Sequence, residues 1–572
     1  MPTLTWVGKD KVVNHHHEVP FRVLEKQNTF TAAEGTPANS TGNLIIHGDN
    51  LEALKSLLPM YEGAIKCIYI DPPYNTGNEG WAYNDAVNDP RMLKWIGQTV
   101  GKEGDDLSRH DKWLCMMYPR LKLLHRLLAN DGAIFVSIDD NEMGNLQLLL
   151  REIFGTGNEV ATLVWEKGKK GDSAFFSVTH EYICVFAKNK ALLKERKVKW
   201  RHRKKGVQEV LDHYESLRSE LGSDHGAIRR RMMAWYRQLP AKDPSKAHKH
   251  YNWSDDRGLY FPDNFHGPDD GRENRPRYPI HHPVTGQPCA IPSTGWRWEE
   301  GTTLAALAQT PPRIHFGADH TTIPNRKSYL FEVDEEPMMS VFYKDGRAAT
   351  LEVEAILGKG VFQFPKDSDV IAELIGLVAT EEGDIVLDSF AGSGTTGHAV
   401  LKLNAQDRKN RQFIMIEMMD YAITLTAERV RRVINGYGAG RNAIAGLGGA
   451  FHFLTVGEPL FKAEDELNEA VSIEIIRSYI AYTEGIPVDC RTARDNPVSP
   501  YLLGRTDDTA WFLHYEPMKE RALDFAFLAS LKVDGQRPQT TIIYADRCLL
   551  SSDFMKKHSI IFKKIPRDIS RF

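Results

Sequence analysis

The sequence is poor in cysteine and lacks long apolar runs. Six cysteines are scattered over 572 residues with no Cys-x-x-Cys pair, which disfavours both a zinc ribbon and a disulfide framework. No stretch of about 18 apolar residues exists, and residues 1–13 lack the apolar segment of a signal peptide. We therefore expect a cytoplasmic protein without a membrane span. We assign no metal site, because the adjacent His15, His16 and His17 have no partner cluster.

A strong overall charge is also missing. The formal net charge is −4, which leaves a nucleic-acid partner open, because such proteins can confine their basic residues to one face. Hydrophobic residues make up 42% of the chain, enough for a large buried core. The length exceeds what one core normally supports, so we expect two to four domains.

Strand-like and helix-like segments alternate in the first third of the chain, which is typical of a parallel α/β sheet. Strands are expected at residues 44–49, 64–71, 133–139, 162–168 and 181–189. A long amphipathic helix is expected from about Asp111, ending in the turn at residues 130–132. Shorter helices are expected from Asn50 and from Asn141.

The pattern changes at about residue 190. Residues 191–205 carry eight basic side chains against one acidic, and the stretch up to Trp298 shows little helical period. Regular α/β pattern resumes with a helix at 369–379, strands at 384–388 and 413–418, and a helix between them from Thr395. We expect these domains: an N-terminal arm at 1–40, catalytic half at 41–190, insertion at 191–330, cofactor half at 331–455, and an α/β appendage at 456–572.

Asp71-Pro72-Pro73-Tyr74 directly follows an apolar strand, and ligands of α/β sheets bind at the carboxyl ends of strands. Methyl transfer to an aromatic amine needs acceptors for its hydrogens, because the nitrogen lone pair is delocalised into the ring. The Asp71 carboxylate and a carbonyl held by the prolines can accept both hydrogens and stabilise the developing positive charge. Tyr74 offers a ring face for stacking an extruded base.

A second motif runs from a strand into a helix at residues 388–396. Gly392 and Gly394 permit a tight turn and close approach of a nucleotide-like ligand. No Gly-Lys-Ser/Thr follows, and the acidic Asp388 suits a cationic cofactor better than a phosphate. The next strand ends at Glu417, where a carboxylate can hold ribose hydroxyls.

At these residues the sequence resembles the amino-methylating DNA methyltransferases, and among them the Mod subunits of Type III restriction-modification systems. Residues 71–77 look like the family's catalytic motif. Residues 388–394 look like its cofactor loop, with Ser389 where proline is common. The order of these motifs is that of the β class. The resemblance implies a circularly permuted, Rossmann-like class I methyltransferase fold with an inserted target-recognition domain, and S-adenosylmethionine as cofactor.

The resemblance also assigns residues. The cofactor set that it implies, together with the motif reasoning above, is Asp49, Asp71, Phe364, Lys366, Asp388, Phe390, Gly392, Gly394, Thr395, Thr396 and Glu417. His180 and Tyr182 stand where the family often has an aromatic that supports the flipped base, beside Tyr74. The partners implied are double-stranded DNA, a second copy of the chain, and a Res-type restriction subunit.

The insertion has side chains suited to DNA. Candidates for DNA contact are Lys199, Arg201, Arg203, Lys204, Lys205, Arg275, Arg277 and Arg297. A run of basic residues is about equally often the solvent-exposed face of a helix that contacts no DNA. For Trp296 and Trp298 we expect a small aromatic core rather than contact with bases.

The residue at position 71 separates the alternatives. Enzymes that methylate cytosine N4 mostly resemble Ser-Pro-Pro, and RNA or protein-glutamine methyltransferases resemble Asn-Pro-Pro-Tyr, so Asp71 favours N6 of adenine. A non-catalytic DNA-specificity subunit is the remaining alternative. It is disfavoured because Asp71 and the turn at Gly392–Gly394 are both intact.

Overall fold

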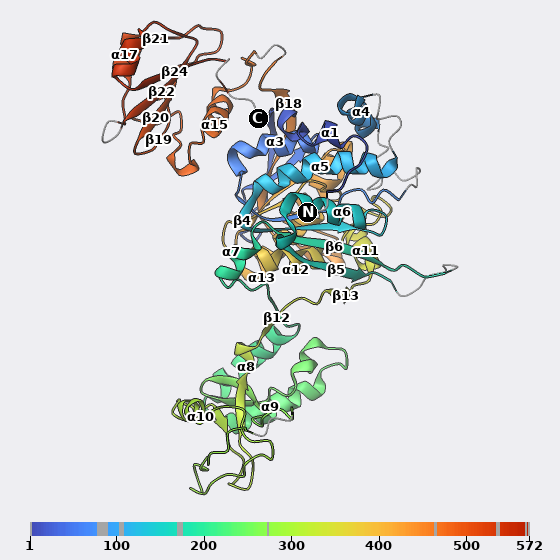
Figure 1. The fold of residues 1–572 in the computed structure, drawn as a ribbon. Helices are drawn as coiled ribbons and strands as arrows, with labels where there is room; N and C mark the ends of the chain where they lie inside the picture. The colour runs from blue at the N-terminus through green and yellow to red at the C-terminus, as the bar shows by residue number, and fades with distance from the viewer. Residues whose placement is uncertain are drawn as a thin grey trace. The chain divides into compact units, whose positions relative to one another are not determined.

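A computed structural model describes residues 3–76, 90–101, 108–168, 175–270, 274–462, 466–533, 538–566 and 569. The chain forms two compact units (Figure 1). The first unit contains residues 1–198 and 339–572, and the second contains residues 199–338. The sequence predicted an insertion at 191–330. The second unit starts later than predicted because helix α7 (Lys190–Glu195) belongs to the first unit. It ends later than predicted because strand β12 (Glu335–Glu336), which closes the second unit, lies beyond residue 330.

The first unit is built on one ten-stranded sheet of order β1-β18-β2-β15-β14-β3-β4-β6-β5-β13. In chain order its strands are β1 (Arg22–Thr31), β2 (Asn43–His47), β3 (Ile65–Ile70), β4 (Leu128–Ile138), β5 (Glu159–Glu166), β6 (His180–Ala187), β13 (Val341–Tyr343), β14 (Ile385–Asp388), β15 (Gln412–Glu417) and β18 (Ala450–Pro459). The six strands from β18 to β4 run parallel, and β1 and β6 run antiparallel to their neighbours.

The chain order of these strands shows the permutation. Strands β2, β3 and β4 precede the insertion, whereas β14 and β15 follow it, yet β14 pairs with β3 and β15 pairs with β2. The carboxyl ends of β3 and β14 therefore lie side by side, although more than 300 residues separate them in the chain. This arrangement confirms the permuted class I methyltransferase fold that the resemblance implied.

Helices cover the sheet through a large apolar core. Helices α3 (Asn50–Tyr61), α5 (Arg109–Leu127) and α6 (Met143–Phe154) pack together over alternate residues of β3 and β4. Helix α12 (Ser368–Val378) contacts β3, and α13 (Thr395–Asp407) contacts β15. The predicted long helix starts at a Ser108–Asp111 capping box and ends at Leu127, where β4 begins at once instead of the expected turn.

The second unit begins and ends in paired strands, β7 (His202–Arg203) with β12. It contains two regular helices that the sequence did not predict, α8 (Val207–Leu221) and α9 (His225–Gln238). The buried residues of both helices recur at three- and four-residue spacing, so the sequence did carry this signal. A four-stranded sheet of order β10-β11-β9-β8 follows, made of β8 (Trp253–Asp255), β9 (Gly258–Asp263), β10 (Ile314–His315) and β11 (Asn325–Tyr329). The region also contains α10 (Glu300–Leu307).

The C-terminal residues form the expected small α/β structure. Helix α15 (Ile473–Thr483) is followed by a sheet of order β19-β20-β22-β24, with β19 (Leu502–Arg505), β20 (Thr509–Leu513), β22 (Thr540–Ala545) and β24 (Ile560–Lys564). The three strands β20, β22 and β24 are parallel. Nowhere in the described part of the chain is a helix both long and apolar enough to cross a membrane.

Candidate functional site

The Asp71 motif is held in place by helix α5. It follows β3 directly, and the indole of Trp113 donates a hydrogen bond to the carbonyl of Pro73 at 2.7 Å. Asn75 adopts the left-handed conformation with φ 58°, and its side-chain amide donates to the carbonyl of Arg109 at 3.1 Å. The turn is therefore fixed before any ligand binds. Gly77, the last residue of the predicted motif, lies outside the described residues.

Asp71 lies in a buried cluster of charges. The ammonium of Lys366 is 2.6 Å from Asp71 Oδ2 and 4.9 Å from the centre of the Tyr74 ring. The Tyr74 hydroxyl donates a hydrogen bond to Glu181 Oε2 at 3.1 Å. Burial disfavours the charged form of Lys366, but the charges of Asp71 and Glu181 outweigh it and raise its pKa above the ordinary value. Lys366 thus remains an ammonium beside Asp71.

The loop after β14 has the form that the glycines predicted. Gly392 and Gly394 have φ 51° and 79°, a region that other residues rarely adopt. Asp388 holds the loop from within, since its carboxylate accepts from the Phe390 amide at 2.9 Å and from the Thr396 hydroxyl at 2.5 Å. Burial raises the pKa of Asp388 to about 7.

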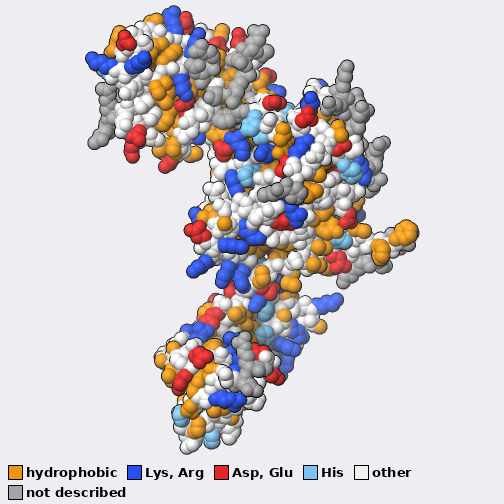
Figure 2. All heavy atoms as spheres, viewed as in Figure 1, with side chains coloured by type: hydrophobic (Ala, Val, Ile, Leu, Met, Phe, Trp, Pro, Cys, Tyr) orange, Lys and Arg blue, Asp and Glu red, His pale blue; other side chains and the backbone are white. Residues whose placement is uncertain are grey.

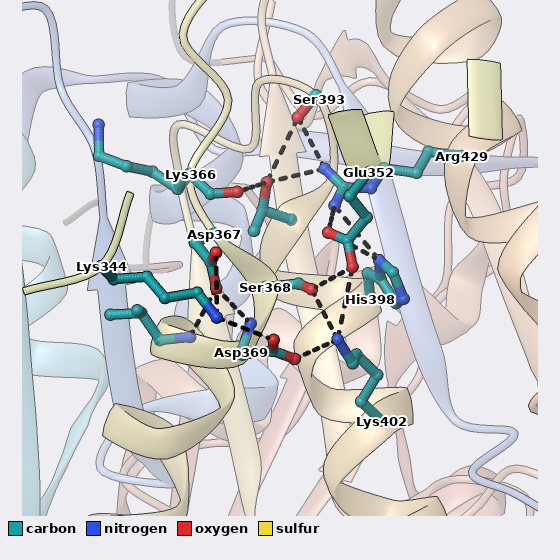
Figure 3. A network of polar contacts seen from close by, with 12 residues as sticks. Lys344, Glu352, Lys366, Asp367, Ser368, Asp369, Ser393, His398, Lys402 and Arg429 are labelled. Atoms are coloured by element: carbon teal, nitrogen blue, oxygen red, sulfur yellow. Dashed lines mark hydrogen bonds and ion pairs between the residues drawn. The ribbon is translucent and has the colours of Figure 1, made fainter. Parts of the chain in front are cut away.

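A network of buried polar contacts supports this loop from below (Figure 3). Arg429 of α14 (Glu428–Asn435) is fully buried and donates to the hydroxyls of Ser393 and Thr395, each at 2.9 Å. Its other terminal nitrogen lies 3.0 Å from Glu352 of α11 (Gly346–Leu357). Arg429 thus joins the loop to a neighbouring helix. The sequence motifs gave no signal for this pair, because an arginine and a glutamate in separate helices are ordinary surface residues.

Glu417 and Asp49 lie at the ends of adjacent strands, β15 and β2. Glu417 accepts hydrogen bonds from the amides of Gly392 and Met419, and burial raises its pKa to about 7. Asp49 caps helix α3 and lies 3.6 Å from the buried guanidinium of Arg120. Asn50 connects this end to the loop, since its amide donates to the Ser389 carbonyl at 3.0 Å.

One pocket joins the two motifs. It is lined by Tyr69, Asp71, Phe362, Phe364, Pro365, Lys366, Asp388, Phe390, Ala391, Gly392, Ser393, Thr395 and Thr396. Eight of the eleven residues predicted to bind the cofactor line it. Asp49, Gly394 and Glu417 are not in the lining, although Gly394 and Glu417 are parts of the loop structure itself.

The residues suggested as support for the flipped base lie elsewhere. His180 and Tyr182 contact each other, with His180 Nε2 and the Tyr182 hydroxyl 3.0 Å apart, and Tyr182 donates to Asp140 at 2.9 Å. Successive strand residues face opposite sides of a sheet, so the residue between them, Glu181, is the one that reaches Tyr74. Of this segment of β6, it is therefore Glu181, which the sequence did not single out, that contacts the Asp71 motif.

In the second unit, several predicted DNA-binding side chains are engaged within the protein. Arg275 pairs with Asp270 at 2.6 Å, Arg203 lies 3.4 Å from Asp334, and Lys204 and Arg277 donate to backbone carbonyls. Six of the eight candidates are nevertheless exposed: Lys199, Arg201, Arg203, Lys205, Arg277 and Arg297. Of these, Arg201 also donates to the Glu335 carbonyl at 3.4 Å. Figure 2 shows further Lys and Arg side chains near the segment labelled α9 in Figure 1. Trp296 is fully buried against Phe265, as expected for a core residue.

The sequence was compared with known proteins and protein families. The sequence model of the family described as DNA methylase matches residues 65–428, which include both motifs. The chain belongs to the DNA methylase family. It is 33% identical over 433 residues to the Type III restriction-modification enzyme EcoP15I Mod subunit of Escherichia coli, an alignment that covers 73% of this chain and 64% of the relative.

Two further matches are a Type II methyltransferase and a solved structure. The Type II methyltransferase M.KpnI of Klebsiella pneumoniae is 27% identical, with 68% of this chain and 84% of the relative covered. The PvuII DNA methyltransferase (cytosine-N4-specific) structure is 13% identical with a TM-score of 0.30, covering 69% of this chain and 89% of that one. The chain spans between 57% and 66% of the length of the first three Mod relatives.

Proposed function

We propose that this DNA methylase transfers a methyl group from S-adenosylmethionine to N6 of an adenine flipped out of double-stranded DNA. The observation that carries the proposal is that both motifs line the same pocket: Asp71, at the end of β3, lies beside the glycine loop at the end of β14. A methyl acceptor held by Asp71 and a cofactor held by the loop would share this pocket.

The residues present fit such a cofactor. Gly392 carries no side chain, and a Cβ there would crowd the Phe362 ring of the pocket lining at 3.3 Å, so glycine keeps this part of the pocket clear. Asp388 and Lys366, both buried, supply opposite charges for the ammonium and carboxylate of a methionine moiety, and Glu417 supplies acceptors for ribose hydroxyls. When bound, S-adenosylmethionine supplies an electrophilic methyl group on its sulfonium.

The chain's part in the reaction is to make the amine a better nucleophile. Because Trp113 already occupies the Pro73 carbonyl, we assign the carbonyl of Pro72 and the Asp71 carboxylate as the acceptors for the two N6 hydrogens. These acceptors favour a pyramidal nitrogen and stabilise its developing positive charge. The Tyr74 ring, with its hydroxyl fixed by Glu181, provides the stacking face.

DNA recognition is assigned to the second unit. Its exposed basic residues can neutralise phosphates or contact base edges; they are Lys199, Arg201, Arg203, Lys205, Arg277 and Arg297. By resemblance to the Mod relatives, we propose that the protein is a modification subunit acting in the cytoplasm, that it works as a homodimer, and that a Res-type restriction subunit is its partner.

The proposal is tested with the purified full chain, S-adenosylmethionine carrying a labelled methyl group, and DNA from cells that lack DNA methylation. We expect label in N6-methyladenine at one sequence context, which single-molecule sequencing of the product would identify. Label in N4-methylcytosine would show that the methylated base is cytosine and not adenine. An absence of label in DNA, while the protein binds both cofactor and DNA, would favour the non-catalytic alternative.

A further inference from the structure

Glu181 and Lys167 lie against the Asp71 motif, and the reaction proposed above gives neither a charge-balancing role. Lys167 is 2.5 Å from Glu181 Oε2, the same oxygen that accepts the Tyr74 hydroxyl. Lys366 is 3.7 Å from that oxygen while it binds Asp71 at 2.6 Å. Glu181 is therefore the point at which the stacking ring and both lysines meet.

The cluster is balanced in charge, and three of its four groups are buried, whereas the Lys167 side chain is 27% exposed. It contains two carboxylates, Asp71 and Glu181, and two ammonium groups, Lys167 and Lys366. The exposed fractions of Asp71, Glu181 and Lys366 are 8%, 5% and 6%. In such surroundings an uncompensated charge acts strongly on its neighbours. Without the Glu181 charge, Asp71 would face both lysines alone, and less of its negative charge would act on the amine.

One further feature of Glu181 lowers the stability of the fold. Glu181 Oε1 is buried and has no hydrogen-bond partner among the described residues. Buried polar atoms are nearly always satisfied, and each exception lowers the free energy of unfolding. Burial and repulsion from Lys366 also lower the pKa of Lys167. Fold stability alone therefore does not explain why Glu181 and Lys167 are paired here.

We propose that Glu181 is a positioning residue of the methyl-transfer site, with Lys167 as its counter-ion. Its carboxylate fixes the Tyr74 ring through the phenol hydroxyl and shares Lys366 with Asp71, so that Lys366 orients Asp71 without neutralising it. This inference rests on the proposed function, because Glu181 acts through Asp71 and Lys366, which line the pocket of that function. It predicts that the charge balance of the cluster, and not merely the presence of Glu181, controls the rate of methyl transfer.

The test compares Glu181→Gln with the double variant Glu181→Gln/Lys167→Met in single-turnover methylation of DNA. Glu181→Gln should lower the rate at least about tenfold, with the KM for DNA and the Kd for S-adenosylmethionine within about twofold of wild type. The double variant restores the balance, so it should be faster than Glu181→Gln but slower than wild type. Glu159→Gln is the matched control, since Glu159 starts the same hairpin and pairs with Arg151 at 2.7 Å, outside the pocket.

Several outcomes would overturn the inference. They are a wild-type rate in Glu181→Gln, a double variant no faster than that single variant, or a fall in rate explained entirely by weaker cofactor binding. If Glu181→Gln does not fold, Glu181→Asp, which keeps the charge, is compared with the double variant, which lacks the carboxylate. Glu181→Asp should be the faster of the two, and a Glu181→Asp rate no higher than that of the double variant contradicts the role. A wild-type protein that does not methylate DNA would instead show that the proposed function itself is wrong.

Discussion

The backbone amide of Gly392 donates a hydrogen bond to Glu417 Oε2 over 2.8 Å. This bond ties the turn of the cofactor loop to the acidic end of the next strand before any ligand is bound. Glu417 and Asp388 are both buried, and burial raises the pKa of each to about 7. Near neutral pH, two carboxyl groups of the proposed cofactor site therefore change their charge together.

Cofactor binding should depend on pH in this range. The ionised Asp388 attracts the cationic cofactor and the ionised Glu417 accepts ribose hydroxyls, so protonation of either group opposes binding. A group with a pKa of about 7 is about 10% ionised at pH 6 and about 90% at pH 8, which allows affinity to rise about tenfold per group. Calorimetry with S-adenosylmethionine measures this, and Asp388→Asn should flatten the profile. Equal affinity at both pH values would contradict the assignment.

Replacement of Asp71 should separate binding from chemistry. Asp71→Ala removes an acceptor that is needed chiefly in the transition state, so transfer should fall by at least about a hundredfold. The Kd for the cofactor and for DNA should change little, because the loop and the second unit are untouched. Single-turnover methylation and calorimetry measure the two effects. Near-normal turnover in Asp71→Ala would show that the mechanism is wrong.

Gly394 should be required for the loop and for the cofactor. Its φ is 79°, and a Cβ there would lie 2.9 Å from the carbonyl of Thr426. Gly394→Ala therefore adds a clash to backbone strain, and should weaken cofactor binding at least about tenfold. Gly383→Ala is the matched control, since Gly383 has the same φ of 79° with nothing within 4 Å. Equal affinity in the two variants would refute the role of the close contact.

Arg429 should stabilise the loop from within the core. Arg429→Met leaves the hydroxyls of Ser393 and Thr395 without their buried donor, while Glu352 keeps Lys402 and the Ser368 hydroxyl, so the free energy of unfolding should fall by about 1–3 kcal/mol. Cofactor affinity should also fall, because Ser393 and Thr395 lose their donor. Arg431→Met on the same helix removes an exposed pair with Glu428 and should cost less than about 1 kcal/mol. Urea unfolding of both variants decides between these outcomes.

Neighbouring residues of the second unit should differ in their effects. Trp296 is buried in an aromatic core, so Trp296→Ala should cost about 3–5 kcal/mol and destabilise this unit. Arg297 is exposed, so Arg297→Ala should leave stability unchanged but weaken DNA binding and reduce its salt dependence. Thermal unfolding and DNA titrations at two salt concentrations measure both. Unchanged DNA affinity in Arg297→Ala would remove it from the interface.

Much of the fold could be predicted from the sequence because its signals are local. Apolar strands next to amphipathic helices, such as 64–71 and 111–130, follow directly from hydrophobic periodicity. The glycine turn and the Asp71 motif are likewise contiguous, so their chemistry is visible without a structure. Helices α8 and α9 also carry a helical period, as Val207, Val210, Tyr214 and Leu217 of α8 show, but the Pro-, Gly- and Arg-rich composition of the surrounding insertion obscured it.

The sequence by itself determined which residues carry reactive groups at strand ends, since each motif is a short run whose chemistry depends on adjacent residues. Only the tertiary structure decided that β3 pairs with β14, that Glu181 rather than His180 reaches Tyr74, and that Arg429 lies under the loop. Strand pairing, sheet face and helix packing bring together residues far apart in the chain. These contacts depend on packing of the whole core, which no local pattern records.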